Sequence, residues 1–178
     1  MRPEWNEYFM IIAKIISSRS TCLSRPIGAV IVKNKHILST GYNGSMPGIS
    51  HCSDEGVCFR RKISVRDEAK YNFCRATHAE ANAISQAARY GISVEGASLY
   101  ITLAPCYTCL KLLATANIKT IYYEQHYESV DKDRDLFWEK SIKEVGIEIK
   151  HLSIAESTIE TVLNHMKSPT SVRRLESV

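Results

Sequence analysis

The sequence contains no uncharged apolar run that approaches the roughly 20 residues of a membrane-spanning helix. It also opens without the basic segment and apolar core of a secretory signal peptide. Internal repeats and low-complexity tracts are absent as well, and a length of 178 residues suits one ordinary domain. From these absences we expect a single-domain cytoplasmic protein that has no membrane partner.

A strong excess of charge of either sign is missing too. The 23 Lys and Arg residues and the 19 Asp and Glu residues are mixed along the chain and leave a net charge of +4. Domains that bind nucleic acid usually gather a dense basic patch. The composition therefore disfavours a nucleic acid partner and fits a small anionic molecule, while an apolar content of 44% is enough for an ordinary core.

Among the residues that are present, the six cysteines say the most about function. In a cytosolic protein, cysteines indicate metal binding or catalysis before disulfides. Cys106 and Cys109 stand in a P-C-Y-T-C run, and an H-A-E triplet that begins at His78 lies upstream. A catalytic zinc ion takes three protein ligands and one water, and imidazole and thiolate suit it well. His78, Cys106 and Cys109 are therefore the predicted zinc ligands.

Glu80 completes this pattern, because a carboxylate that does not bind the metal is free to move protons. Zinc lowers the pKa of a bound water toward neutrality, and a carboxylate within hydrogen-bond reach carries its proton to the substrate. Each half of the pattern has another interpretation. The stretch from Thr77 to Glu80 also fits a helix capping box, and a lone C-x-x-C motif also occurs in redox pairs and structural zinc sites. Together the halves form the H-x-E…P-C-x-x-C pattern of zinc-dependent nucleobase deaminases.

Apolar periodicity and turn residues divide the chain into helices and strands that alternate in its later part. We expect helices at 4–18, 78–90, 106–116, 133–145 and 155–166, and strands at 28–32, 36–40, 99–103, 118–123 and 147–152. Residues 41–74 form a connection too long to be idle, and the chain from Ser168 onward is expected to fray. This order predicts an α/β fold, a three-layer α/β/α sandwich with a mixed five-stranded sheet. Both halves of the zinc pattern then fall at helix N-termini, where the dipole stabilises thiolate.

Several stretches resemble the deoxycytidylate branch of the cytidine and deoxycytidylate deaminase superfamily over about residues 4–152. They are Arg19–Cys22, Gly28–Val32, Gly41–Gly44, His51-Cys52, His78–Ile84, Gly96–Tyr100, Pro105–Cys109, Tyr122-Tyr123 and Tyr127. The resemblance implies a cytidine deaminase-like fold. It also implies a zinc-dependent deaminase domain at 1–153, followed by a C-terminal helix and tail at 154–178.

The reaction that the resemblance implies is the hydrolytic deamination of dCMP to dUMP, which supplies thymidylate synthesis. Glu80 would then be the proton shuttle and Asn43 would contact the sugar. Ala79 would lie against the base through its backbone, and Tyr127 would contact the substrate. Without the resemblance, Asn43 with the glycine after it reads as a plain turn, and Tyr127 as a half-buried core aromatic.

Regulation and assembly are implied by the resemblance as well. Members of this family are typically hexamers that dCTP activates and dTTP inhibits, with Mg²⁺, at a separate site between subunits. Asn43, Gly44 and Arg89 are the residues expected in that region. Arg89 also fits a solvated charge near a helix C-terminus.

A second, structural zinc is expected near the long connection, because some family members hold one there. A closed thiolate site would pin a segment that has few apolar residues of its own. The candidate ligands are Cys22, Cys52, Cys58 and Cys74, with His51 as a spare. Their spacing is loose, and the alternative is a set of reduced, partly buried thiols.

Three other functions remain open from the sequence. The same zinc chemistry serves enzymes that deaminate a base within RNA or DNA, and the basic stretch of Arg60, Arg61, Lys62, Arg66 and Lys70 fits that class. It also fits contact with a nucleotide phosphate or simple solvation. A different free substrate, such as cytidine, dCTP or a pterin-like or riboflavin precursor, is the second. A non-catalytic zinc-binding or competence-related protein is the third, and the presence of Glu80 argues against it.

Overall fold

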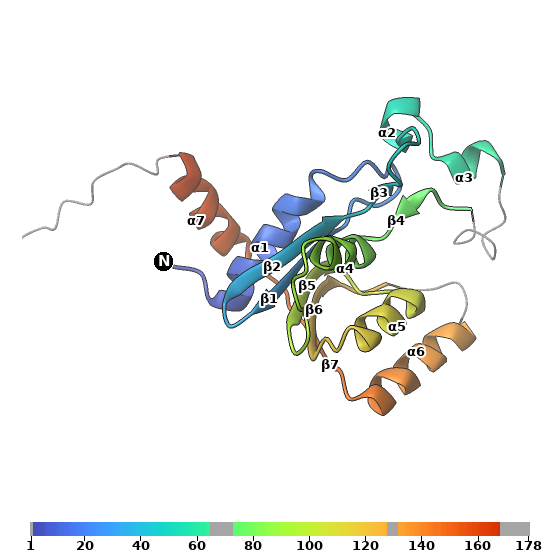
Figure 1. Cartoon of the computed structure of the whole chain (residues 1–178). Helices are drawn as coiled ribbons and strands as arrows, with labels where there is room; N and C mark the ends of the chain where they lie inside the picture. Colours follow the sequence, from blue (N-terminus) through green and yellow to red (C-terminus); the bar gives the residue numbers. More distant parts are fainter. Residues whose placement is uncertain (1, 65–72, 128–131, 168–178) are drawn as a thin grey trace, which may run out of the picture.

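The structure is a computed structural model that describes residues 2–64, 73–127 and 132–167. Its helices are α1 (Trp5–Ser17), α2 (Cys52–Glu55), α3 (Phe59–Lys62), α4 (Ala79–Arg89), α5 (Tyr107–Thr115), α6 (Lys132–Val145) and α7 (Glu156–Lys167). Its strands are β1 (Gly28–Lys33), β2 (His36–Tyr42), β3 (Gly44–Ser45), β4 (Ala76–Thr77), β5 (Ser98–Leu103), β6 (Thr120–Gln125) and β7 (Glu148–His151). Each predicted helix and strand has its counterpart, with small shifts at the ends (Figure 1). The tail predicted to fray from Ser168 lies outside the described residues.

The main sheet has five strands in the order β2-β1-β5-β6-β7. β1 pairs antiparallel with β2 and with β5, whereas β5 with β6 and β6 with β7 pair in parallel. A two-residue turn suffices between β1 and β2, while β6 and β7 are each reached through a helix, as parallel strands require. The predicted mixed sheet is confirmed.

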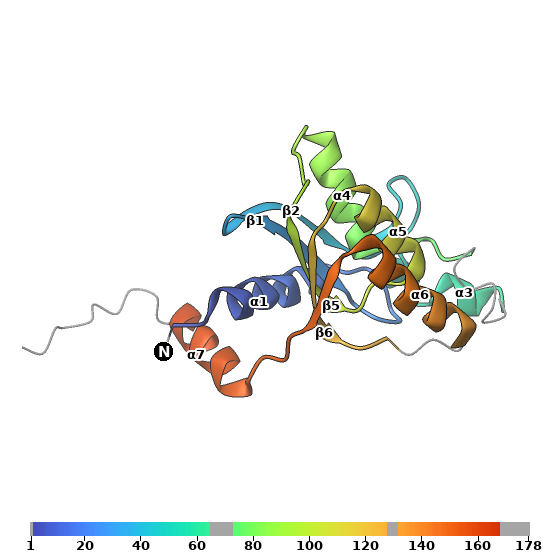
Figure 2. The ribbon, with the colours of Figure 1, turned by 90° about the horizontal axis from the view of Figure 1, so that it is seen from below.

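Helices cover both faces of this sheet, which confirms the three-layer sandwich. Helix α1 lies on one face, and α4, α5 and α6 lie on the other (Figure 2). Ala29 and Ile31 of β1 belong to the larger buried apolar cluster, shared with α4 and α5. Val30 and Val32 belong to the smaller cluster, shared with α1. Because both faces are buried, β1 is a continuous apolar run and not an alternating one.

The long connection after β2 carries structure that the sequence pattern does not indicate. β3 pairs antiparallel with β4, with Gly44 opposite Thr77, and this pairing brings the two ends of the connection together. Helices α2 and α3 lie between these strands in the sequence and extend beyond one end of the sheet (Figure 1). Elements of two to four residues are too short to show a period, so they were not predicted.

The C-terminal helix packs on the same chain. Ile154 is buried in the smaller cluster, and Ile159 and Val162 of α7 pack against it. The hydroxyl of Thr158 donates a hydrogen bond to Glu7 Oε1 at 3.3 Å. The boundary predicted between 153 and 154 stays a prediction. Within the described ranges, no helix has the length and apolar character required to cross a bilayer.

Gly41 sets how closely α4 approaches the sheet. A Cβ atom built at this position would collide with the carbonyl oxygen of Ala79 and would lie 2.5 Å from the backbone nitrogen of Ala83. Both of these atoms belong to the backbone of α4, so a side chain at position 41 would force the helix away from β2. Only glycine allows this contact between helix and strand.

We expect Gly41→Ala to lower the free energy of unfolding by about 1–3 kcal/mol, because the added methyl group overpacks this contact. Thermal or urea unfolding followed by circular dichroism measures the change. Ser39→Ala, in the same strand, is the matched control: the buried Ser39 hydroxyl has no hydrogen-bond partner among the described residues, so its loss leaves stability unchanged or slightly higher. A Gly41→Ala protein as stable as wild type would contradict the close approach.

Candidate active site

Both halves of the zinc pattern lie at the start of a helix. His78 is the N-cap of α4 and Cys106 is the N-cap of α5, and neither side chain caps its helix. The capping-box interpretation of Thr77 to Glu80 is therefore wrong, because Thr77 belongs to β4 and the helix begins one residue later. Both helices pack on the same face of the sheet through the larger cluster, which brings their N-termini together.

The three predicted ligands meet at this point. The ligand atoms of His78, Cys106 and Cys109 all lie within 4.8 Å of one another. His78 Nδ1 is 3.6 Å from the sulfur of Cys106 and 3.4 Å from that of Cys109. Tetrahedral zinc with ordinary Zn–N and Zn–S bond lengths holds nitrogen and sulfur about 3.6 Å apart. The spacing and the chemistry of this donor set therefore fit zinc.

The protein groups alone already favour negative charge on sulfur. A hydrogen bond from the Cys109 thiol, together with one from His78, lowers the pKa of Cys106 to about 4. The same hydrogen bond to Cys106 raises the pKa of Cys109, because it holds the proton on that thiol. Hydrogen bonding to Cys106 also raises the pKa of His78. A thiolate at Cys106 is the form that binds a metal.

Glu80 lies in the first turn of α4, two residues after His78, and is 3% exposed. Burial raises the pKa of its carboxyl to about 7, and positive charge on His78 opposes that rise. A carboxyl with a pKa near neutrality can both accept and release a proton at physiological pH. Its burial beside the donor atoms gives Glu80 the placement expected of a proton carrier.

A cavity of about 330 Å³ opens beside these groups. Glu80, His78 and Cys106 line it, as do the predicted substrate contacts Asn43 and Tyr127. The rest of its wall is formed by Cys22, Ser24, Arg25, Ile27, Arg60, Arg61, Ser64, Cys74, Ala76, Leu103 and Ala104. A volume of this size suits one small organic ligand.

Asn43 does more than face the cavity, because its side chain fixes the loop that precedes β1. Its Oδ1 accepts hydrogen bonds from the backbone nitrogen of Ile27 at 2.8 Å and from the hydroxyl of Ser20 at 2.6 Å. Its Nδ2 donates to the carbonyl oxygen of Arg25 at 2.8 Å. The turn interpretation of Asn43-Gly44 is thus inadequate, since the residue ties β2 to a distant part of the chain.

The sequence as a whole identifies the family. Residues 3–125 match the family described as the cytidine and deoxycytidylate deaminase zinc-binding region. The chain belongs to this family of deaminases. Relatives of known name include ComE operon protein 2 of Bacillus subtilis, which is 35% identical over 89% of this chain and 77% of its own. The deoxycytidylate deaminase of Mycobacterium phage D29 is 40% identical over 68% of this chain and 95% of its own.

Solved structures give the same family. The dCMP deaminase of the cyanophage S-TIM5, in complex with dCMP and dUMP, is 29% identical and covers 85% of this chain and 99% of its own, with a TM-score of 0.67. In its form without ligand, that enzyme matches with a TM-score of 0.63. The deaminase described here therefore shares both sequence and architecture with dCMP deaminases.

The residues expected at an effector site are spread along this deaminase. Gly44 lies in β3 opposite Thr77, next to the start of α4. Arg89 is the last residue of α4 and is exposed, with its guanidinium 6.0 Å from the ring centre of Tyr90. The length of the 11-residue helix, about 16 Å, therefore separates them. Within one chain the structure does not bring Gly44 and Arg89 together.

The other four cysteines of the deaminase do not form a comparable donor set. Within residues 2–64, 73–127 and 132–167, His78 with Cys106 and Cys109 is the only group of three or more potential ligands at such spacing. Cys22 and Cys74 line the cavity, Cys58 is buried beside α3 and Cys52 begins α2. His51 Nδ1 lies 3.1 Å from the hydroxyl of Thr21. The second, structural zinc stays a prediction.

Cys109→Ser should lose the zinc bound at α4 and α5, because serine does not supply the thiolate that this donor set requires. Elemental analysis of fully loaded protein should show one zinc fewer per chain than in wild type. Thr108→Ser, a neighbouring change that leaves the three donors intact, is the control. The same measurement tests the second site: wild-type protein holds two zinc ions per chain if that site forms and one if it does not.

Proposed function

We propose that this protein deaminates dCMP to dUMP and ammonia, with water as the co-substrate, and so supplies dUMP for thymidylate synthesis. The observation that carries the proposal is the buried Glu80 carboxyl beside the His78, Cys106 and Cys109 donors, at the wall of a cavity sized for one nucleotide. Relatives named deoxycytidylate deaminase, and the S-TIM5 enzyme solved with dCMP and dUMP, support the choice of substrate.

In this proposal, zinc held by His78, Cys106 and Cys109 would polarise the attacking water and lower its pKa. Glu80 takes a proton from that water on a carboxylate oxygen and delivers it to the ring nitrogen next to the carbon under attack. The same carboxyl then helps the amine leave as ammonia. Its pKa of about 7 matches both directions of transfer, and its burial keeps bulk water from competing.

Three further residues orient the substrate in the proposed complex. Ala79, the completely buried first residue of α4, would lie against the base through its backbone. Asn43 contacts the sugar while its remaining hydrogen bonds hold the loop at Arg25. Tyr127 lines the cavity and contacts the substrate.

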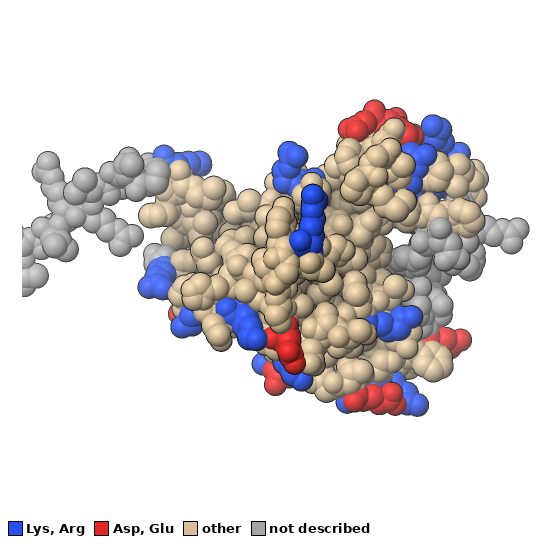
Figure 3. All heavy atoms as spheres, viewed as in Figure 1, with Lys and Arg blue, Asp and Glu red and all other residues tan. Residues whose placement is uncertain are grey.

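A cavity for one nucleotide supports a free substrate over a base within RNA or DNA. An enzyme that acts on a strand needs a positively charged surface along which the strand can lie. On the face seen in Figure 3, Lys and Arg side chains are scattered, and those near α3 lie beside the acidic residues of α2. Figure 3 therefore offers no support for a strand-binding surface on that face.

The proposal extends to regulation and assembly. The deaminase is activated by dCTP and inhibited by dTTP, each with Mg²⁺, at a site that includes Asn43, Gly44 and Arg89, and it works as a hexamer in the cytoplasm. Because Gly44 and Arg89 lie at opposite ends of α4, a site that uses both requires two chains. Regulation and oligomerisation are therefore linked in this proposal.

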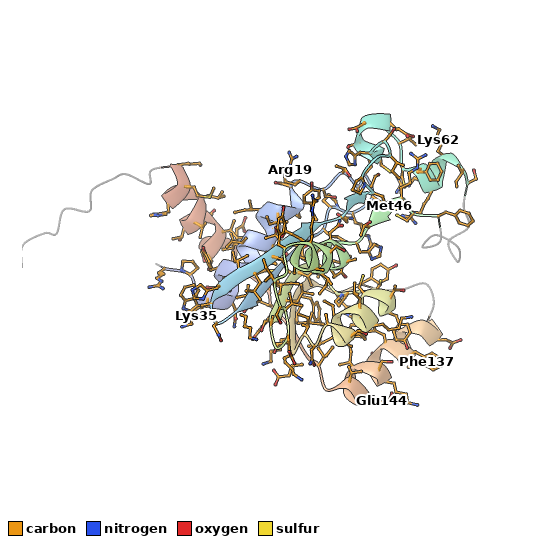
Figure 4. The ribbon with its side chains drawn as sticks, viewed as in Figure 1. Arg19, Lys35, Met46, Lys62, Phe137 and Glu144 are labelled. Atoms are coloured by element: carbon orange, nitrogen blue, oxygen red, sulfur yellow. The ribbon has the colours of Figure 1, made fainter. Side chains whose placement is uncertain are left out.

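Glu80→Gln should retain zinc and abolish turnover of dCMP, because the amide keeps the shape of the carboxyl but cannot carry a proton. We expect a rate loss of at least about 100-fold, the lower range for a general acid–base residue. Absorbance assays with dCMP and elemental analysis measure the two properties. Glu144→Gln, on the exposed side of α6 (Figure 4), is the control and should match wild type. Substantial turnover by Glu80→Gln would overturn the mechanism.

With Mg²⁺ present, dCTP should raise the rate of dCMP deamination and dTTP should lower it. Initial rates at sub-saturating dCMP, combined with size-exclusion chromatography, measure the response and the oligomeric state together. Arg89→Gln should weaken the response, because it removes a cation from the proposed effector region. Identical rates with and without both nucleotides would contradict the regulatory part of the proposal and leave the catalytic part intact.

A further inference from the structure

The cavity wall is rich in cations and poor in anions. Arg25, Arg60 and Arg61 line it, and among the described residues that form its wall Glu80 is the only Asp or Glu. Glu80 has the role of proton carrier at the metal donors, so it does not neutralise three guanidinium groups. Such a wall attracts an anionic part of the ligand rather than a neutral sugar or base.

Arg60 has a buried hydrogen-bond donor without an acceptor among the described residues. Its side chain is half-buried, and its Nε atom is buried with no hydrogen-bond partner within the described part of the chain. An orphaned buried N–H group of this kind costs free energy unless a ligand or water satisfies it. Among the described residues, Arg60 also forms no ion pair with a carboxylate. Its side chain does form a hydrogen bond with the thiol of Cys58, so the buried Nε is the donor that an anion in the cavity would satisfy.

Helix α3, which carries Arg60, is held in place by contacts with Arg75. The guanidinium of Arg75, next to β4, lies 3.7 Å from the ring centre of Phe59 and donates a hydrogen bond to Glu55 Oε1 at 2.8 Å. These contacts attach α2 and α3 to the strand that leads into α4. Arg60 is thus presented to the cavity by a supported element and not by a loose loop.

Arg25 comes to the same cavity from another part of the chain. Its guanidinium lies over the ring of Tyr127, 5.3 Å from the ring centre. Its carbonyl oxygen accepts the hydrogen bond from Asn43 Nδ2. The backbone and the side chain of Arg25 are therefore both restrained, which lowers the entropy lost when the guanidinium binds a ligand.

We propose that Arg25 and Arg60 bind the 5′-phosphate of the substrate and make this deaminase selective for the nucleotide over the nucleoside. A phosphate monoester carries about −1.5 to −2 charges at pH 7, and the planar guanidinium matches its oxygens with paired donors. The phosphate satisfies the buried Nε of Arg60, a group that a nucleoside leaves unpaired. This inference rests on the proposed function, because it assigns the part of dCMP that distinguishes it from deoxycytidine.

The test compares dCMP with deoxycytidine as substrates of full-length, zinc-loaded protein. Arg60→Gln should lower kcat/KM for dCMP by about 10- to 100-fold, the range for losing a hydrogen bond to a charged group. Deoxycytidine has no phosphate, so its kcat/KM should stay within about twofold. Arg25→Gln should show the same selectivity with a smaller loss, about 2- to 10-fold, because Arg25 is exposed and solvent screens its charge.

Two further variants separate phosphate binding from general effects of charge or folding. Lys62→Gln removes a cation from the same helix, but Lys62 lies on its outer side (Figure 4) and does not line the cavity. It should retain the preference for dCMP. Arg60→Lys keeps the charge and loses the planar fork, so it should recover part of the dCMP rate that Arg60→Gln loses. Zinc content and thermal unfolding confirm that each variant is folded.

Equal losses for dCMP and deoxycytidine would overturn the inference, because they indicate a structural role for the arginines. Unchanged dCMP kinetics in both arginine variants would overturn it too. Failure of the proposed function is a separate result, in which wild-type protein deaminates neither compound. In that case the phosphate site is tested by binding instead of turnover: calorimetry measures the affinity of Glu80→Gln protein for dCMP and for deoxycytidine. If Glu80→Gln protein binds dCMP more tightly than deoxycytidine, and adding Arg60→Gln removes that difference, the phosphate site is supported. If Glu80→Gln protein binds the two compounds equally, the phosphate site is overturned.

Discussion

The close packing of α4 on the sheet is the constraint on which the site depends. Three alanines, Ala79, Ala83 and Ala87, face the sheet and are buried, and Gly41 presents a bare backbone to them. Small residues on both sides let the helix axis lie near β2 and β1. His78 and Glu80 are at the start of that helix, so their distance from α5 follows from this packing.

Two helices that start at the same end of a sheet give the site its chemistry. The N-cap positions of α4 and α5 place His78 and Cys106 where backbone N–H groups point toward them, and Cys109 follows one turn later. The positive ends of both helices favour thiolate. The same arrangement buries Glu80 among groups that change its proton affinity. The proposed metal binding and proton transfer thus depend on one structural feature, the convergence of these two N-termini.

Local sequence patterns predicted the parts of the molecule that local interactions determine. The sequence predicted the helices α1, α4 and α5 from their apolar periodicity, and it predicted the buried strands and the two halves of the zinc pattern. Each of these features depends on residues a few positions apart. Each half of the zinc pattern is local, whereas the packing of α4 and α5 on the sheet brings the predicted metal ligands together. The capping box at Thr77 was wrong, since the pairing of β4 with β3 holds that residue in a strand and the N-cap of the helix is His78.

Contacts between distant segments could not be predicted from the sequence. Nothing in the sequence pattern indicated a role for Arg25, because only Tyr127 and Asn43, far away in sequence, place it at the cavity. Arg60 was recognised as part of a basic stretch, yet the burial of its Nε depends on how α3 packs in the folded chain, where Phe59 contacts Arg75. The tether from Asn43 to Ile27 and Arg25 likewise needs the folded chain, so the pair Asn43-Gly44 looked like an ordinary turn.

The cavity wall joins elements of unequal stability. The metal donors stand on α4 and α5, which belong to the larger buried cluster, whereas α2 and α3 contribute few buried side chains and depend on the contacts of Arg75. Segments with few buried contacts open more often than the core. Opening of α2 and α3 would therefore uncover one side of the cavity while the donor atoms stay assembled. In the proposed reaction, substrate could then enter and product leave without disturbing the metal donors.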